Sequence, residues 1–156
     1  MRKVLLLATI VVLVALVGLL PFDGTDIGKL HPVEVLAVSR KDGTLLLQTD
    51  SGMSGTGKNV DDALSALRLS SSGNIFLETA NYLLIGQDCT DEVASFWEFV
   101  RPACQVYYFK GRGPIGEIGD FLESHPSRAT VLRCIQGAGE IPLIVLEGES
   151  VRLERE

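Results

Sequence analysis

The feature that most constrains this chain is an uninterrupted apolar run near its N-terminus. It extends from Val4 to Leu20, and only Thr9 and Gly18 within it are not strongly apolar. A helix over these 17 residues is about 26 Å long at about 1.5 Å per residue, close to the roughly 30 Å of a bilayer's hydrocarbon core. The run is therefore predicted to be a transmembrane helix.

The charges around this run predict its orientation. Arg2 and Lys3 precede it, whereas Asp23 and Asp26 follow it, a bias that keeps the N-terminus in the cytoplasm and the remainder outside. A cleaved signal peptide is the alternative, but the run exceeds the usual core of about 7–15 residues, and its end offers no pair of small residues for cleavage. We expect an anchor or uncleaved signal over residues 1–22, a linker over 23–32, and an extracytoplasmic domain over 33–156.

Charge further restricts the partners. The chain has 14 Lys and Arg against 20 Asp and Glu, a net charge of −6. Without Arg2 and Lys3, the predicted outer part has 12 basic residues against 20 acidic ones. Such a surface is repelled by nucleic-acid phosphates and by anionic lipid headgroups. Three Cys and two His are too few and too scattered for a zinc site. The sequence predicts a membrane-attached protein that binds neither nucleic acid nor metal.

Beyond residue 32 the pattern predicts an α/β (mixed α+β) domain with a mixed sheet. Residues 33–40 and 44–49 are β-prone and flank Asp42-Gly43, which indicates a hairpin. Further strands are predicted over residues 80–85 and 105–110, and a closing hairpin over 141–147 and 150–154. Residues 129–135 fit either a helix or a strand.

Three segments have the apolar spacing of amphipathic helices: residues 60–67, 93–100 and 115–122. Asn59 is a suitable N-cap for the first, Pro102 ends the second, and Pro114 starts the third. The second lies between two predicted strands, and so short a crossover indicates a right-handed βαβ unit with parallel strands. A domain of this size buries a core without disulfides.

A first glycine motif lies between the predicted hairpin and the first helix. Gly52 to Lys58 matches the GxxxxGK pattern of nucleotide-binding loops. The next residue is Asn59, where those loops carry the hydroxyl that binds Mg²⁺. We expect a loop that leads into a capped helix, and phosphate or nucleotide binding through Lys58 remains a remote alternative.

A second glycine motif follows the strand over residues 105–110. Gly111 to Gly116 satisfies GxGxxG, but a dinucleotide fingerprint belongs to the first unit of a larger sheet. Pro114 stands where a helix is predicted to start. These glycines are thus explained by a loop and a helix N-terminus, and no cofactor is expected.

No catalytic constellation is evident in the sequence. Cys89, Cys104 and Cys134 are interpreted as buried small apolar residues, with a Cys104–Cys134 disulfide as the alternative, and none is next to a His. Three aromatic residues are candidates for contact with a protein partner: Trp97, Tyr107 and Tyr108. Trp97 also fits a core position, because it lies on the apolar stripe of the second predicted helix. The sequence therefore predicts a binding protein rather than an enzyme.

The order of the central segments resembles a known family. The stretches Gly55–Leu67 (GTGKNVDDALSAL), Ile75–Leu77 (IFL) and Tyr82–Gly86 (YLLIG) resemble the N-terminal domain of Ger(x)C proteins, the C-subunit lipoproteins of bacterial spore germinant receptors. The resemblance covers roughly residues 33–125. It implies a non-enzymatic accessory of spore germination that docks onto membrane partners, including germinant-receptor subunits.

Two features depart from that family. Its members carry a lipobox cysteine, whereas no Cys precedes Cys89 here, so the resemblance implies anchoring by the helix itself. The later domains of full-length members are also missing, which implies a truncated relative. A membrane-tethered binding or assembly module unrelated to germination is the alternative function.

Overall fold

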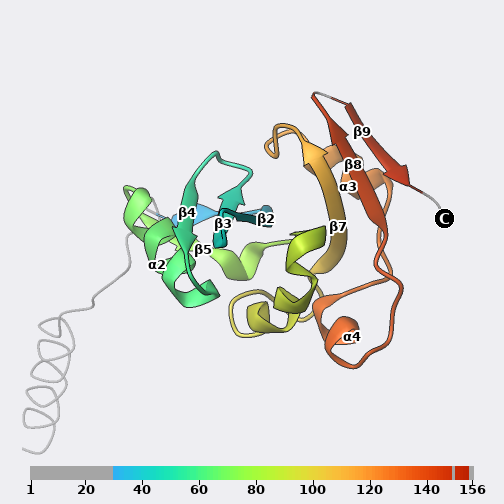
Figure 1. Cartoon of the computed structure of the whole chain (residues 1–156), viewed down its shortest axis with the longest axis horizontal. Coiled ribbons are helices and arrows are strands. Elements are labelled where there is room, and N and C mark those ends of the chain that lie inside the picture. The colour runs from blue at the N-terminus through green and yellow to red at the C-terminus, as the bar shows by residue number, and fades with distance from the viewer. Residues whose placement is uncertain (1–29, 149, 155–156) are drawn as a thin grey trace, which may run out of the picture.

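The computed structural model describes residues 30–148 and 150–154, which fold around one twisted sheet (Figure 1). Its seven strands have the order β4-β3-β2-β6-β7-β8-β9, and the four consecutive strands β2, β6, β7 and β8 are parallel. The outer strands β3, β4 and β9 are antiparallel to their neighbours. The strand bounds are β2 Val35–Lys41, β3 Thr44–Thr49, β4 Ser54–Gly57, β6 Tyr82–Gly86, β7 Gln105–Arg112, β8 Leu143–Glu147 and β9 Ser150–Glu154.

The first hairpin follows from its turn residues. Asp42 and Gly43 have φ values of 51° and 78°, and two residues with positive φ form the turn whose twist matches that of paired strands. Lys41 pairs with Thr44 across this turn. The predicted hairpin is confirmed, as are the closing hairpin β8–β9 and the parallel pairing of β6 with β7.

Helical segments cover both faces of the sheet. On one face, α2 (Val60–Ser70), the 3₁₀ segment η3 (Gln87–Phe96) and α4 (Val131–Ile135) pack over the larger core. On the other face, α3 (Gly119–Ser124) and the loop before it pack over the smaller core. Leu64, Leu67 and Phe96 belong to the first core, and Ile118 and Leu122 to the second. This arrangement confirms a mixed α+β fold.

The three predicted helices differ in how closely they match the structure. The first is confirmed as α2, in which the Asn59 side chain accepts a hydrogen bond of 2.8 Å from the backbone N–H of Asp62. The second is not a regular α-helix but 3₁₀ turns interrupted by a non-helical Cys89, whose side chain the kink places in the core. The third begins at Gly119 instead of Pro114, because the glycine-containing loop before it stays irregular.

Several short elements were not predicted. A separate two-stranded parallel sheet joins β1 (Leu30–Pro32) to β5 (Asn74–Phe76), and the 3₁₀ turn η2 (Leu77–Thr79) follows. The last three residues of the linker expected over 23–32 are thus part of the fold. The ambiguous segment 129–135 contains the short helix α4. Elements of three to five residues carry too little periodicity to be recognised from sequence.

Within residues 30–148 and 150–154, no helix is long and apolar enough to cross a membrane. The predicted anchor over residues 1–22 lies outside the described residues.

Candidate functional site

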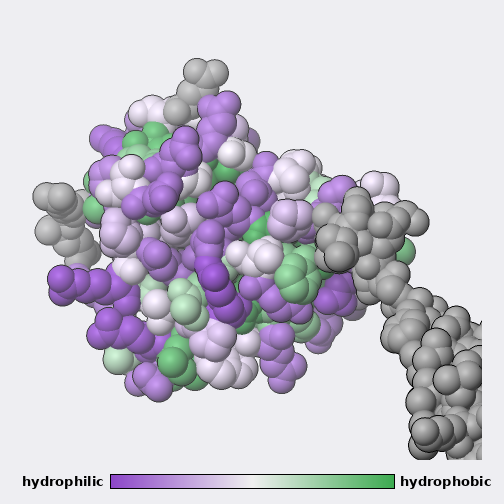
Figure 2. Space-filling view, turned by 180° about the vertical axis from the view of Figure 1, so that it is seen from behind, coloured by the Kyte–Doolittle hydropathy of each residue, from purple (hydrophilic) through white to green (hydrophobic). Residues whose placement is uncertain are grey.

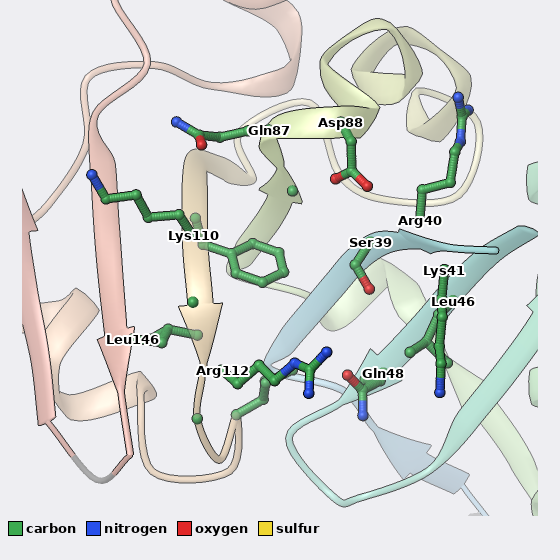
Figure 3. Close-up of a pocket in the computed structure, with 15 residues that line it drawn as sticks. Ser39, Arg40, Lys41, Leu46, Gln48, Gln87, Asp88, Lys110, Arg112 and Leu146 are labelled. Carbon is green, nitrogen blue, oxygen red and sulfur yellow. The ribbon is translucent and has the colours of Figure 1, made fainter. Parts of the chain in front are cut away.

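A cleft of about 690 Å³ lies at the carboxyl ends of the parallel strands (Figure 3). Its walls are the ends of β2, β6 and β7, and β3 closes one side. The connection after β6 runs to the face that carries the larger core, whereas the connection after β7 runs to the opposite face. Where adjacent connections diverge in this way, an open α/β sheet forms the crevice in which such folds bind ligands.

Four cationic side chains line this cleft, although the chain as a whole is acidic: Arg40, Lys41, Lys110 and Arg112. Arg40 forms a 3.0 Å ion pair with Glu92, and Lys110 pairs with Glu154. Arg112 and Lys41 form no ion pair with any described residue. The cleft therefore retains positive charge that its own neighbours do not neutralise.

The labelled side chains show how the polar groups are arranged (Figure 3). Arg112 extends from the end of β7 toward Gln48 on β3 and Ser39 on β2. Asp88, from the first turn of η3, points into the cleft from the opposite side. The cleft thus presents a guanidinium, a hydroxyl and an amide on one side and a carboxylate on the other.

The second glycine motif forms part of this rim. Gly111 has a φ of +94°, and a Cβ there would lie 2.1 Å from the carbonyl oxygen of Leu146 on β8. A Cβ on Gly113 would lie 2.6 Å from the carbonyl oxygen of Gly148. These glycines allow the end of β7 to pack against the closing hairpin, and this packing explains them without a dinucleotide.

The first glycine motif is not the loop that the sequence suggested. Ser54–Gly57 is the strand β4, which pairs with β3 through Leu47↔Gly55 and Leu45↔Gly57. A Cβ on Gly55 would lie 2.3 Å from the backbone nitrogen of Leu67 in α2. The glycines thus let a helix lie directly on an edge strand, whereas the backbone of a phosphate-binding loop has to cradle the ligand.

The three aromatic residues predicted to contact a partner have different surroundings. Trp97 is 40% exposed and remains available at the surface. Tyr108 is partly buried and packs against the larger core. Tyr107 is fully buried, so its prediction as a partner contact is wrong: its hydroxyl donates 2.9 Å to the carbonyl of His125 and accepts 2.8 Å from the N–H of Ser127. Burial raises the pKa of Tyr107 to about 12.

We expect Tyr107→Phe to destabilise the domain by about 1–3 kcal/mol, because the buried hydroxyl loses its hydrogen bonds with the carbonyl of His125 and the N–H of Ser127, each worth about 0.5–1.5 kcal/mol. The measurement is the free energy of unfolding in urea. Tyr108→Phe is the matched control, since Tyr108 is only partly buried and its hydroxyl forms no hydrogen bond with a described residue. It should change that free energy by less than about 0.5 kcal/mol. Equal effects of the two variants would contradict the assignment.

The cysteines are all free thiols. Cys89 and Cys104 are buried and Cys134 is half-buried, and burial raises the pKa of the first two to about 11 and about 12. Such thiols are protonated at neutral pH and are poor nucleophiles. Among the described residues, no group of three or more His, Cys, Asp or Glu side chains could hold a metal ion.

A second surface lies at the opposite edge of the sheet. Four large hydrophobic residues at the amino ends of the parallel strands are exposed: Leu69, Phe76, Trp97 and Leu132. Leu69 is 87% exposed near the end of α2. Phe76, on β5, pairs with Pro32 on β1, the strand that comes just before β2 in the chain. We call these four residues the apolar end. On the side of the molecule seen in Figure 2, hydrophobic residues occur as small areas among hydrophilic ones.

The chain matches no family model, no curated protein and no solved structure.

The sequence identified Trp97 as a candidate contact residue, but it predicted neither the cleft nor the other three residues of the apolar end. One available signal was that Arg40, Lys110 and Arg112 fall at or near the ends of predicted strands, which meet at one edge of a parallel sheet.

Proposed function

We propose that this chain is a non-enzymatic, single-pass membrane protein whose α/β domain lies outside the cytoplasmic membrane. It acts by docking onto membrane partners, as an accessory of spore germination. The observation that carries the proposal is the apolar end, which lies where the described chain begins.

Strand direction places these residues at the same edge of the sheet, and the N–H of Leu132 donates to the carbonyl of Pro102, shortly before β7. β1 immediately precedes β2, so it lies at the amino edge of the parallel strands, and β5 pairs with it. α2 starts beside the carboxyl edge, where Gly57 pairs with Leu45, and runs back to the amino edge near Leu69. η3 likewise starts after β6 and brings the chain back to Gln105, at the start of β7.

The length of the linker limits how far this end lies from the membrane. Nine residues separate Leu20 from Leu30, and nine residues reach at most about 30 Å when fully extended. The tether therefore keeps β1, at the amino edge, within about 30 Å of the membrane, and the apolar end makes that edge the proposed docking face. The domain's net negative charge disfavours anionic headgroups, so the preferred contact of the apolar end is the outer part of a membrane protein.

The resemblance of residues 33–125 to Ger(x)C proteins supplies the biological context. Its matched segments correspond to β4 and α2, β5 and η2, and β6, which are consecutive elements of the fold. Germinant-receptor subunits are the partners that this resemblance suggests.

Topology is tested first, with a single exposed cysteine. Lys58 is exposed, so Lys58→Cys in a Cys134→Ser background should react with an impermeant maleimide added to intact cells. The Cys134→Ser protein alone is the blank, because Cys89 and Cys104 are buried. Labelling only after lysis would overturn the proposed orientation.

Docking is tested by substituting residues of the apolar end in the native host and measuring the rate of germination. Leu69→Ser combined with Phe76→Ser should slow germination to the rate of the deletion strain, because the contact loses two apolar side chains. Glu117→Ser, an exposed substitution near the opposite edge, should keep the wild-type rate. Normal germination of the deletion strain would rule out the germination role and leave the unrelated tethered module.

A further inference from the structure

We propose that the cleft at the carboxyl edge binds a small organic carboxylate whose other end carries a hydroxyl or ammonium donor. This inference goes beyond the proposed docking function, because the cleft and the apolar end lie at opposite edges of the sheet. Either one can fail without affecting the other.

Charge selects an anion. The cleft is lined by four cationic side chains, and Arg112 and Lys41 form no ion pair with a described residue. The rest of this acidic domain repels anions, so the unneutralised cations make the cleft the place to which an anion is attracted.

Arg112 selects the carboxylate group. A guanidinium binds a planar carboxylate through two parallel N–H···O bonds, and Arg112 points into the cleft (Figure 3). Ser39 and Gln48, toward which it extends, supply a hydroxyl and an amide that can donate to the same group. Lys41 is exposed farther along β2, where it adds positive charge.

Asp88 defines the other end of the ligand. Its carboxylate faces the cleft from the side opposite Arg112 and pairs with no described cation. A carboxylate there accepts hydrogen bonds from a hydroxyl or ammonium group and repels a second negative charge. The same repulsion disfavours inorganic phosphate, which carries more negative charge than a monocarboxylate.

Isothermal titration calorimetry of the full chain in a neutral detergent tests the proposal, with γ-hydroxybutyrate, butyrate and inorganic phosphate as probes. We expect saturable one-to-one binding of γ-hydroxybutyrate, weaker binding of butyrate, and the weakest binding of phosphate. Arg112→Gln should weaken γ-hydroxybutyrate binding by about tenfold or more, because a charge-assisted pair is lost.

Two further variants sharpen the result. Asp88→Ala should remove the advantage of γ-hydroxybutyrate over butyrate, because that advantage depends on the terminal hydroxyl that faces Asp88. Arg68→Gln, a substitution of an exposed arginine on α2, should leave binding unchanged. The proposal is overturned if no probe binds at millimolar concentration, if phosphate binds most tightly, or if Arg68→Gln weakens binding as much as Arg112→Gln.

Discussion

Gly55→Ala is expected to destabilise the domain by about 3 kcal/mol or more, at the upper end of the effects of overpacking. The added Cβ would lie 2.3 Å from the backbone nitrogen of Leu67 and 2.4 Å from the carbonyl oxygen of Ala63. Both atoms belong to the backbone of α2, so relief requires the helix to move away from β4. Urea unfolding of the detergent-solubilised full chain measures the loss.

Ser54→Ala is the matched control, because Ser54 is the exposed neighbour of Gly55 on the same strand. It should change the free energy of unfolding by less than about 0.5 kcal/mol. A phosphate-binding loop at Gly52 to Lys58 leads to a different expectation, in which Gly55→Ala leaves stability intact. Unchanged stability would therefore contradict the packing of α2 on β4.

Phe96→Ala is expected to cost about 3–5 kcal/mol, the usual range for removing a buried phenylalanine. Phe96 is fully buried in the larger core, at the end of η3. Because 3₁₀ turns have poorer hydrogen-bond geometry than an α-helix, η3 depends on this side chain to stay on the sheet. The same unfolding measurement applies.

Ser95→Ala is the control for this substitution, since Ser95 is exposed and, within the described part of the chain, its hydroxyl bonds only to the nearby Glu92. Its effect should stay below about 0.5 kcal/mol. A loss of less than about 1 kcal/mol for Phe96→Ala, well below the range for core phenylalanines, would mean that η3 is not held by the core.

The sequence predicted those parts of the fold whose determinants are local. Asp42-Gly43 forms its hairpin turn, and Asn59 caps its helix, because turn and cap chemistry act over a few residues. η3 was mistaken for an α-helix because Val93 and Phe96 have helical spacing, while the kink at Cys89 depends on the sheet beneath it.

The candidate site was harder to predict, because its residues meet only after strand pairing. Ser39, Asp88 and Arg112 come from three strand ends far apart in sequence, and no spacing rule connects them. Tyr107 was misassigned for the related reason that alternation alone does not reveal which face of a strand is covered. Its burial depends on residues 115–122, which pack over that face.

The length of β2 has a consequence for ligand access in the proposed orientation. β2 has seven residues, and at about 3.3 Å per residue it separates the two edges of the sheet by roughly 23 Å. The surface potential of a membrane decays over a Debye length of about 8 Å at physiological ionic strength. An anion that approaches Arg112 thus lies almost three such lengths beyond the edge nearest the headgroups, where their repulsion is screened.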